Sequence, residues 1–382
     1  MGNYKNLTII AHLPHYKLGN SEWVAYEPYV REIELWAQLY ERVKIYTDIK
    51  KGSPKGNNKT LPANCKVKPI YVQSGPGIKN NVIRLLQLPY AFVHILLIML
   101  NSKTIHLRSP GITTIIANLI NKVINKPTII KWATHFKRMP IVAPIIHWEM
   151  SLLQNPPSNS KVLIYSEGTH QNHIPFIPAL MSKSEIDKIE VKNKDLVWEP
   201  PFTLLCVGRL FVYKDFDFVI TGLTLFKIQH PEVKWHLNII GDGAEKSKLL
   251  ELVSKGNITK NVSFHGALDF NTVLEFYHKS HIAIMPGRYE GWGKVINEAW
   301  ATNTIPLVVN EGNAPYVVKM GGNAGVLYEH DKQLFSDKLF ELVNYSNNEI
   351  KSLSKLGREA NYGMTLESFQ KGIKQIMDDL LK

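Results

Sequence analysis

The chain has little cysteine and no hydrophobic leader at its start. Its 382 residues include two cysteines, which is too few for a disulfide framework or a cysteine-based metal cluster. One of them, Cys206, lies inside an apolar run, where we expect a core thiol. Residues 1–8 lack the apolar region of a signal peptide, and Asn6 spoils a match to the myristoylation pattern. We therefore expect a reduced, cytosolic protein.

Acidic residues are scarce in part of the first half. The net charge of +12 arises there because residues 51–150 contain one acidic residue, Glu149, whereas the second half is balanced. The same window contains an apolar stretch, Val82–Leu100, which Arg84 interrupts, so a membrane-spanning helix is not expected. Two interpretations stay open: a buried helix of an α/β domain, and a helix that lies in an anionic membrane surface. A nucleic-acid partner is disfavoured because no recognition motif accompanies the charge.

The length of the chain suits two domains, and both halves alternate short apolar strands with helical stretches. That alternation is typical of parallel sheets. The predicted strands of the first half are Leu7–Ala11, Val43–Thr47, Val67–Tyr71, Thr104–Leu107, Thr128–Trp132 and Val162–Tyr165. Those of the second half are Thr203–Val207, Lys234–Ile240, Val262–His265, His281–Met285, Ile305–Val309 and Gly325–Leu327. The predicted helices include Glu27–Leu39, Phe216–Gln229, Ala244–Ser254, Asn271–His278 and Leu366–Leu381.

Loops and the domain boundary are marked by turn-forming residues. Gly52–Thr60 is polar and basic, and we predict a loop there. Paired prolines in Val197–Phe202, together with the change in charge balance, indicate the linker. The predicted domains are therefore residues 1–197 and 198–365.

The most informative segment is Pro286–Ala301, in which Glu290 and Glu298 stand eight positions apart. It follows the predicted strand His281–Met285, and a helix is expected from Val295 onward. A strand, a glycine-bearing turn and a helix place backbone amides and a helix N-terminus at the carboxyl edge of a sheet, where anions bind. Alone, the two glutamates could also be the general acid and base of a hydrolase.

A second strand–turn–helix segment opens the second domain. In it, Arg209 and Lys214 flank the turn at the expected ligand-facing edge. Asp215 and Asp217 could be a D-x-D metal motif. We reject that interpretation because Asp215 suits a helix N-cap and Asp217 suits the first helical turn.

These two segments resemble those of the retaining glycosyltransferases of family 4. The pair Glu290 and Glu298 matches the acidic E-x7-E pair of that family, and Gly208–Asp217 matches its G-R-L-x-x-x-K-G-x-D segment. Asp215 stands where the family usually has glycine. The resemblance covers about residues 200–330. It implies an α/β protein of the GT-B fold, in which two Rossmann-like domains have parallel sheets facing each other across a cleft. It also implies that the last helix, within residues 366–382, packs back on the first domain.

The resemblance assigns roles around the donor. One carboxylate, Glu290, would lie by the donor sugar, and Glu298 would hold the ribose. Arg209 and Lys214 would hold the diphosphate, because fixed cations stabilise the charge that develops on a leaving phosphate. No metal is then required. The donor-binding residues implied in this way are Gly208, Gly241, Gly243, His265, Gly266, Gly291, Trp292, Gly293, Lys294, Val295 and Glu298.

The first domain has weaker signals. Members of the family use a glycine-rich loop after the first strand, and the loop predicted here, residues 12–21, offers Gly19 as its candidate. The family also places a histidine of this domain near the sugar. His12, His106 and His135 are candidates, and we favour His135 as the catalytic one.

The resemblance thus implies retaining transfer of a sugar from a UDP- or GDP-linked donor to a hydroxyl of a glycan or lipid-linked acceptor, without a cofactor. Synthesis of cell-surface polysaccharide, capsule or lipopolysaccharide is the expected setting, in the cytoplasm or on the inner face of the cell membrane. Two alternatives are a nucleotide-sugar epimerase of the same fold and a non-catalytic scaffold subunit that binds nucleotide sugars. The Arg209–Lys214 segment argues against the epimerase, and the intact acidic pair argues against the scaffold.

Overall fold

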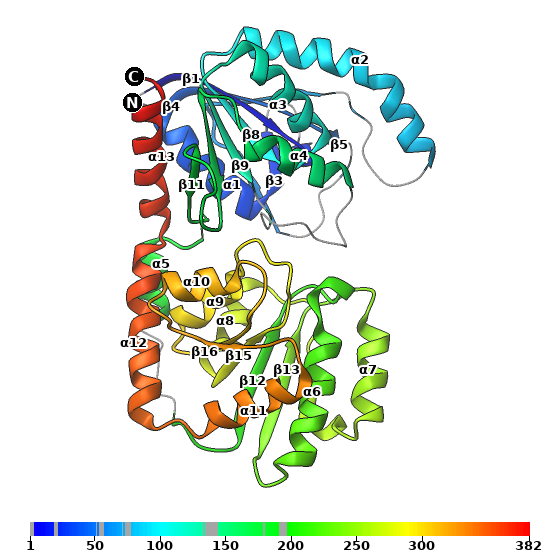
Figure 1. Ribbon diagram of the computed structural model, residues 1–382, viewed down its shortest axis with the longest axis vertical. Coiled ribbons are helices and arrows are strands. Elements are labelled where there is room, and N and C mark those ends of the chain that lie inside the picture. The colour runs from blue at the N-terminus through cyan, green and yellow to red at the C-terminus, as the bar shows by residue number, and fades with distance from the viewer. Residues whose placement is uncertain are drawn as a thin grey trace. The chain divides into compact units, whose positions relative to one another are not determined.

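The computed structural model describes residues 4–18, 22–50, 52, 57–70, 72, 78–132, 134, 144–178, 180–190 and 197–382. The chain forms two compact units (Figure 1). The first comprises Met1–Leu180 with Leu366–Lys382, and the second comprises Met181–Thr365. The stretch Val197–Phe202, expected to be a linker, lies inside the second unit and leads into its first strand.

The first unit is built on a seven-stranded sheet in which every neighbouring pair is parallel, with the order β11-β10-β9-β8-β1-β4-β7. Its strands are β1 (Tyr4–Ala11), β4 (Tyr40–Thr47), β7 (Cys65–Pro69), β8 (Ile105–Ser109), β9 (Thr128–Trp132), β10 (Ser160–Ile164) and β11 (His173–Pro175). The six strands predicted for this half are confirmed to within a few residues. The short β11 was not predicted.

Helices cover both faces of this sheet. On one face, α1 (Glu27–Leu39) and the last helix, α13 (Leu366–Leu380), share an apolar layer with β1, and α13 contributes Phe369 and Ile373 to it. On the other face, α2 (Ile78–Leu100), α3 (Ile112–Ile124) and α4 (Pro144–Gln154) pack together. Helix α1 begins at Glu27 with a proline in its first turn, as predicted, since proline is tolerated where no intrahelical N–H bond is needed.

The loop predicted after β1, residues 12–21, contains a strand. The chain there forms β2 (His15–Leu18) and β3 (Glu22–Tyr26), an antiparallel pair. With β5 (Ile49–Lys50) and β6 (Asn58–Thr60) they make a separate four-stranded sheet, so the loop predicted over Gly52–Thr60 also ends in a strand. Aromatic and β-branched residues such as Trp23 and Val24 favour strands, and that preference outweighs the polar neighbours.

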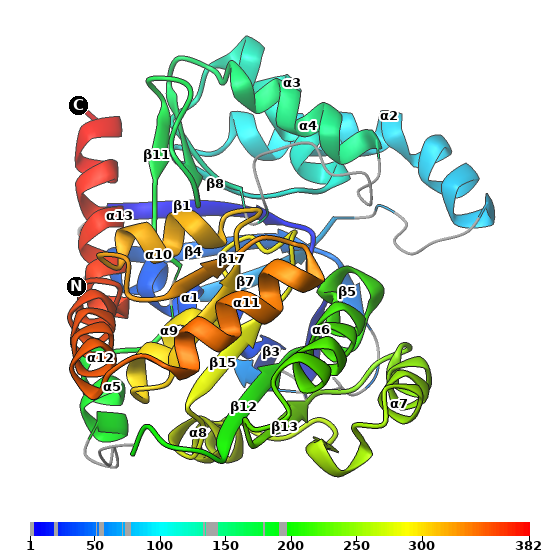
Figure 2. The same ribbon diagram turned by 60° about the horizontal axis from the view of Figure 1, so that its bottom comes forward.

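The second unit has a six-stranded parallel sheet in the order β14-β13-β12-β15-β16-β17. Its strands are β12 (Phe202–Val207), β13 (Trp235–Ile240), β14 (Val262–Phe264), β15 (Ile282–Met285), β16 (Ile305–Val309) and β17 (Val326–Tyr328). The helices are α5 (Lys183–Glu190), α6 (Phe216–Gln229), α7 (Lys246–Lys255), α8 (Phe270–His278), α9 (Lys294–Ala301), α10 (Ala314–Met320), α11 (Lys332–Val343) and α12 (Asn347–Gly363). Helices α6, α7 and α11 pack on one face of the sheet, and α8 and α9 pack on the other (Figure 2).

The strand order of the second unit marks one edge for binding. The chain runs from β12 outward to β13 and β14, and then returns to β15 on the other side of β12. In open parallel sheets, ligands bind outside the carboxyl ends of the strands at such a reversal. That edge carries Gly208 after β12 and Pro286 after β15.

Candidate functional site

The candidate site is built by the turns that follow β12 and β15. These two strands are direct neighbours, with Leu204 opposite Ile282. The turn after β12 includes Arg209 and a short 3-10 helix, Val212–Lys214. Because parallel neighbours end at the same edge, this turn and the one that carries Glu290 leave the sheet side by side.

Lys214 and Glu290 form an ion pair, although they stand 76 positions apart in the chain. The ammonium Nζ donates to Oε1 of the carboxylate, and both side chains are about one-fifth exposed. The pair joins the two turns directly. A diphosphate at this edge would compete with Glu290 for the Lys214 ammonium.

Asp215 departs from the predicted N-cap role. It stands at the N-cap position of α6, but its side chain makes no capping hydrogen bond there. Its carboxylate instead accepts a hydrogen bond from Arg288 Nε at 2.9 Å. Its backbone is left-handed, with φ 52° and ψ 33°. That conformation is the one that glycine adopts without steric cost, which accounts physically for glycine at this position in the family.

Arg209 is exposed at the same edge. Its guanidinium carbon lies 5.5 Å from the ring centre of Phe211. Within the part of the chain that the structure describes, no carboxylate pairs with Arg209. An anion could therefore bind this cation without first breaking an ion pair among these described residues.

Two glycines after β13 are required by close packing of the backbone. A Cβ atom at Gly241 would lie 1.8 Å from the carbonyl oxygen of Gly208, and one at Gly243 would lie 2.3 Å from that of Leu210. Both glycines therefore let the turn after β13 press against the turn that carries Arg209. Beside them, Gly266 has a left-handed φ of 71° with open space around it, and its carbonyl accepts from Gly241 N at 2.7 Å.

The turn after β15 is anchored at its far end. The Trp292 ring is buried, and its Nε1 donates to Asn297 Oδ1 at 2.7 Å, so this side chain holds the turn in place. The carbonyl of Gly291 accepts from Asn313 Nδ2 at 2.8 Å. Gly293 has a left-handed φ of 78° and stands directly before α9, which begins one residue earlier than predicted.

Glu298 lies on α9 with its carboxylate held by a neighbouring helix. Tyr277 of α8 donates its hydroxyl to Glu298 Oε2 at 2.9 Å. Burial raises the pKa of Glu298, whereas the hydrogen bond from Tyr277 and the charge of Lys294 act to lower it. On the first turn of the same helix, Lys294 is exposed and Val295 is half-buried.

The side chain of His265 contacts other residues of the second unit. A ring nitrogen, Nε2, lies 2.8 Å from Asn238 Oδ1, and the ring centre lies 4.5 Å from that of Phe276. Burial, and secondarily the nearby His236, lower the pKa of His265. His265 and Gly266 directly follow β14, at the carboxyl edge of the sheet.

Comparison with known proteins identifies the domain that contains this site. Residues 187–361 match the family model described as Glycosyl transferases group 1. The second unit contains a glycosyl transferases group 1 domain. An uncharacterized glycosyltransferase of Methanocaldococcus jannaschii is 25% identical over 177 residues, which are 46% of this chain and 48% of that protein. The amylovoran biosynthesis glycosyltransferase AmsD of Erwinia amylovora is 31% identical over 142 residues, 37% of this chain and 38% of that protein. The chain thus spans about half or less of the length of these curated relatives.

Solved structures establish the fold of both units together. Sucrose-phosphate synthase of Thermosynechococcus elongatus matches with a TM-score of 0.69 and 16% identity over 99% of each chain. WaaG, a glycosyltransferase involved in lipopolysaccharide biosynthesis, matches with a TM-score of 0.64 and 15% identity over 97% of this chain and 99% of that one. HepE of Anabaena, solved with UDP and glucose, has a TM-score of 0.65 at 12% identity over 98% and 99%. The predicted GT-B class of two parallel-sheet α/β units is confirmed.

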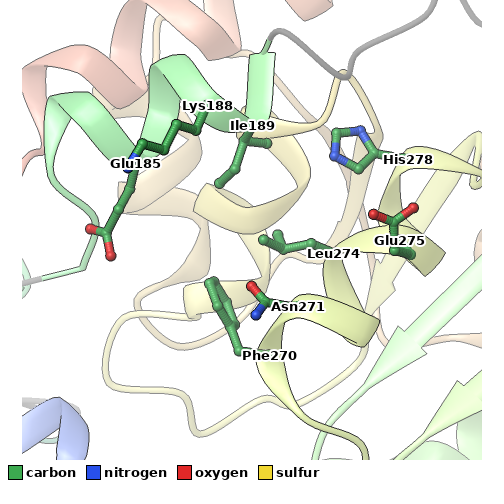
Figure 3. A pocket seen from close by; sticks show the side chains of 8 residues that line it. All are labelled: Glu185, Lys188, Ile189, Phe270, Asn271, Leu274, Glu275 and His278. Atoms are coloured by element: carbon green, nitrogen blue, oxygen red, sulfur yellow. The ribbon is translucent and has the colours of Figure 1, made fainter.

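A cavity in the second unit is lined by other residues (Figure 3). It has a volume of about 520 Å³ and opens between α5 and α8. It is lined by Glu185, Lys188, Ile189, Phe270, Asn271, Leu274, Glu275 and His278. No donor-binding candidate is among them, so this cavity is not the predicted donor site. Among the described residues, no cluster of histidine, cysteine, aspartate and glutamate side chains could hold a metal ion.

Two candidates of the first unit, Gly19 and His135, lie outside the described residues. The other two histidines have different surroundings. His106 is buried and stacks on Trp36 at 4.6 Å, and burial lowers its pKa to about 4, so it is neutral at pH 7. His12 is exposed directly after β1, at the carboxyl edge of the sheet.

Sequence reasoning missed a buried charge cluster in the first unit. Glu32 of α1 accepts from Lys131 Nζ at 2.6 Å and from Arg108 Nη1 at 2.7 Å, across 99 and 76 positions of the chain. Although burial opposes ionisation, the charges of Lys131 and Arg108 hold the pKa of Glu32 well below its usual range. The hydrophobic pattern of the sequence could have indicated this cluster, because Glu32 falls among the apolar residues of α1 and Lys131 falls within an apolar strand.

Proposed function

We propose that this protein is a retaining glycosyltransferase of family 4, which transfers a sugar from a nucleotide-diphospho-sugar to an acceptor hydroxyl. The observation that carries the proposal is the convergence of Arg209, Lys214 and Glu290 at the reversal of strand order in a glycosyl transferases group 1 domain. The match to the family model supports the assignment to glycosyltransferases. The converging charges support a binding site for a sugar diphosphate.

In this mechanism, the donor diphosphate binds Arg209 and takes the Lys214 ammonium from Glu290. Both cations stabilise the charge that grows on the leaving phosphate. Released from Lys214, the Glu290 carboxylate accepts hydrogen bonds from donor sugar hydroxyls. Glu298, oriented by Tyr277, binds the ribose, and the backbone at His265 and Gly266 lies by the base. No metal ion is required, because the two cations balance the phosphate charge.

Retention at the anomeric carbon follows if the acceptor approaches on the face from which the diphosphate leaves. The leaving phosphate then takes the proton of the acceptor hydroxyl. The first unit would bind the acceptor, with Gly19 and His135 near the donor. The UDP bound to HepE supports a UDP-linked donor, and the involvement of WaaG in lipopolysaccharide biosynthesis supports a cell-surface glycan or lipid-linked acceptor.

A panel of nucleotide sugars tests the proposed reaction. The purified protein should release UDP or GDP from one member of the panel, faster when an acceptor is present. The product linkage, read by NMR, should keep the anomeric configuration of the donor. Epimerisation without an acceptor would favour the epimerase, and binding without turnover would favour the scaffold.

We further propose that the first unit binds an anionic membrane surface through α2. The structure has no described helix that is long and apolar enough to cross a membrane. One side of α2 packs on the sheet through Ala91, Ile95 and Met99. The opposite side is exposed and apolar, and its first turns extend beyond the sheet (Figures 1 and 2); the exposed residues are Val82, Leu85, Leu86, Tyr90, Phe92, Val93, Leu97 and Leu100.

The charge around α2 favours an anionic surface. The single acidic residue of residues 51–150, Glu149, is buried and accepts hydrogen bonds from Gly111 N and Thr114 Oγ1, so it presents no charge outward. An apolar helix face beside an excess of lysine and arginine is the composition of an interfacial helix. The packed side of α2 fits one interpretation of the sequence, a buried helix of an α/β domain, and the exposed leucines on its other side support membrane binding.

Replacing Leu85 and Leu86 with glutamate should abolish membrane binding. Wild-type protein should sediment with vesicles that contain anionic lipid at low salt, and the double variant should lose at least tenfold in partitioning, since two apolar side chains are replaced by charges. Ile228→Glu is the control, because Ile228 is equally exposed but lies on α6 of the second unit. Absence of wild-type binding to anionic vesicles would contradict this proposal.

A further inference from the structure

Two ion pairs of opposite polarity join the turns after β12 and β15. In the first, Lys214 of the β12 turn provides the cation and Glu290 of the β15 turn provides the anion. In the second, the signs are reversed: Asp215 provides the anion and Arg288 provides the cation, with 2.9 Å between Arg288 Nε and Asp215 Oδ2. Each turn thus contributes one charge of each sign, at adjacent or nearly adjacent positions.

The second pair is more enclosed than an ordinary surface ion pair. The side chains of Asp215 and Arg288 are 13% and 30% exposed. The nearby pair of Asp217 and Lys248 is 39% and 51% exposed. Water and salt screen partly buried charges less than exposed ones, so the enclosed pair holds its partners more firmly.

A histidine adds to the enclosure of Asp215. The ring of His330 stacks on Phe218 of α6, with 4.2 Å between the ring centres, and its Nε2 lies 3.9 Å from Asp215 Oδ2. The carboxylate of Asp215 therefore lies between Arg288 and an aromatic stack. This arrangement fixes its direction toward the β15 turn rather than toward the first turn of α6.

We propose that Asp215 is a positioning residue that acts through Arg288. When the donor diphosphate binds Lys214 and separates it from Glu290, the pair of Asp215 and Arg288 still holds the turn that carries Glu290. This inference rests on the proposed function. Binding of the diphosphate breaks the first ion pair, because phosphate replaces Glu290 as the partner of Lys214. The pair of Asp215 and Arg288 does not contact the diphosphate in this scheme, so it keeps the two turns together during transfer.

The far end of the β15 turn is already fixed by other contacts. Trp292 and the carbonyl of Gly291 are held by Asn297 and Asn313, as described above. At the near end, two side chains of the turn pair with the turn after β12: Glu290 with Lys214, and Arg288 with Asp215. Once the diphosphate binds Lys214, the pair of Arg288 and Asp215 remains. Loss of this anchor would let the segment between Pro286 and Glu290 move, and the Glu290 carboxylate would move with it.

Asp215→Gly is the sharpest test. Glycine accepts the left-handed backbone without strain, which offsets part of the lost ion pair, so the melting temperature should change little. Hydrogen exchange of amides in residues 286–293 should become several-fold faster. The kcat for transfer should fall roughly tenfold, as expected for a misplaced group near the reacting atoms, while donor KM changes less because the ribose contact remains.

Arg288→Met should reproduce these effects, and the double variant should lose no more than either single one, since both changes remove one interaction. Arg288→Lys should restore part of kcat by keeping a cation beside Asp215. Asp217→Asn is the matched control, because it breaks an exposed ion pair two residues away and should change neither exchange nor kcat.

The exchange and kinetic readouts separate the possible failures. If Asp215→Gly leaves the amide hydrogen exchange of residues 286–293 unchanged, Asp215 does not hold the β15 turn, whatever the activity. Faster exchange with unchanged kcat would overturn the positioning role. A wild-type protein without transfer activity would instead refute the proposed function. Amide hydrogen exchange would still show whether Asp215 holds the β15 turn.

Discussion

Arg209→Met should lower kcat/KM for sugar transfer by roughly 10²–10³-fold, the usual cost of removing one fixed group that stabilises transition-state charge. The physical reason is the diphosphate charge that grows as the sugar bond breaks. Arg209 is suited to this test, because it is exposed and, among the described residues, has no carboxylate partner. Its removal therefore breaks no ion pair among those residues, and the melting temperature should be unchanged. Initial rates with the matched nucleotide sugar provide the measurement.

Two companion variants sharpen that result. Arg209→Lys should show an intermediate loss, because an ammonium keeps the charge but not the forked geometry with which guanidinium binds phosphate. Lys248→Met removes an exposed cation from the same domain and should leave the rate unchanged. Lys214→Met is less informative, since it also removes the ion-pair partner of Glu290 and so changes two proposed donor contacts at once. Near-wild-type rates in Arg209→Met would refute the assignment of the donor site.

The sequence was sufficient where the fold is encoded locally. Thr128–Trp132, Ile305–Val309 and Phe216–Gln229 were predicted with the bounds that the structure has, because each is a distinct apolar run with clear ends. Short motifs also singled out Arg209 and Glu290, each on its own strand–turn–helix segment, and their roles stay predictions.

The sequence was insufficient where partners are far apart or strands are short. Asp215 and Arg288 stand 73 positions apart, so no local pattern links them, and Asp215 was instead assigned a local capping role. The strands β2 and β3 are held by pairing with each other and with two further short strands, not by a buried apolar run. Such pairing depends on tertiary context, which residue spacing does not encode.

Glu32 illustrates how much a long-range contact can matter for stability. Glu32→Ala should lower the free energy of unfolding of the first unit by about 3–5 kcal/mol, the cost of removing one partner from a buried ion pair. The change would leave Lys131, which is 4% exposed, and the partly exposed Arg108 without their shared carboxylate. Urea unfolding at pH 7 measures the loss. Glu34→Ala is the matched control on the same helix, because Glu34 pairs with exposed Lys59 and should cost less than about 1 kcal/mol.

The pH dependence of stability should identify the same group. The pKa of Glu32 is lowered in the folded state, so its stabilisation is complete above the unfolded pKa of about 4.3 and is lost as pH falls below that value. Glu32→Ala should therefore flatten the acid limb of the stability curve. Removing both opposing charges as well, in Glu32→Leu with Lys131→Met and Arg108→Met, should recover much of the loss, because apolar groups of similar volume replace a buried charge cluster at little cost. If Glu32→Ala destabilises the unit no more than Glu34→Ala, the cluster contributes nothing to stability beyond a surface ion pair.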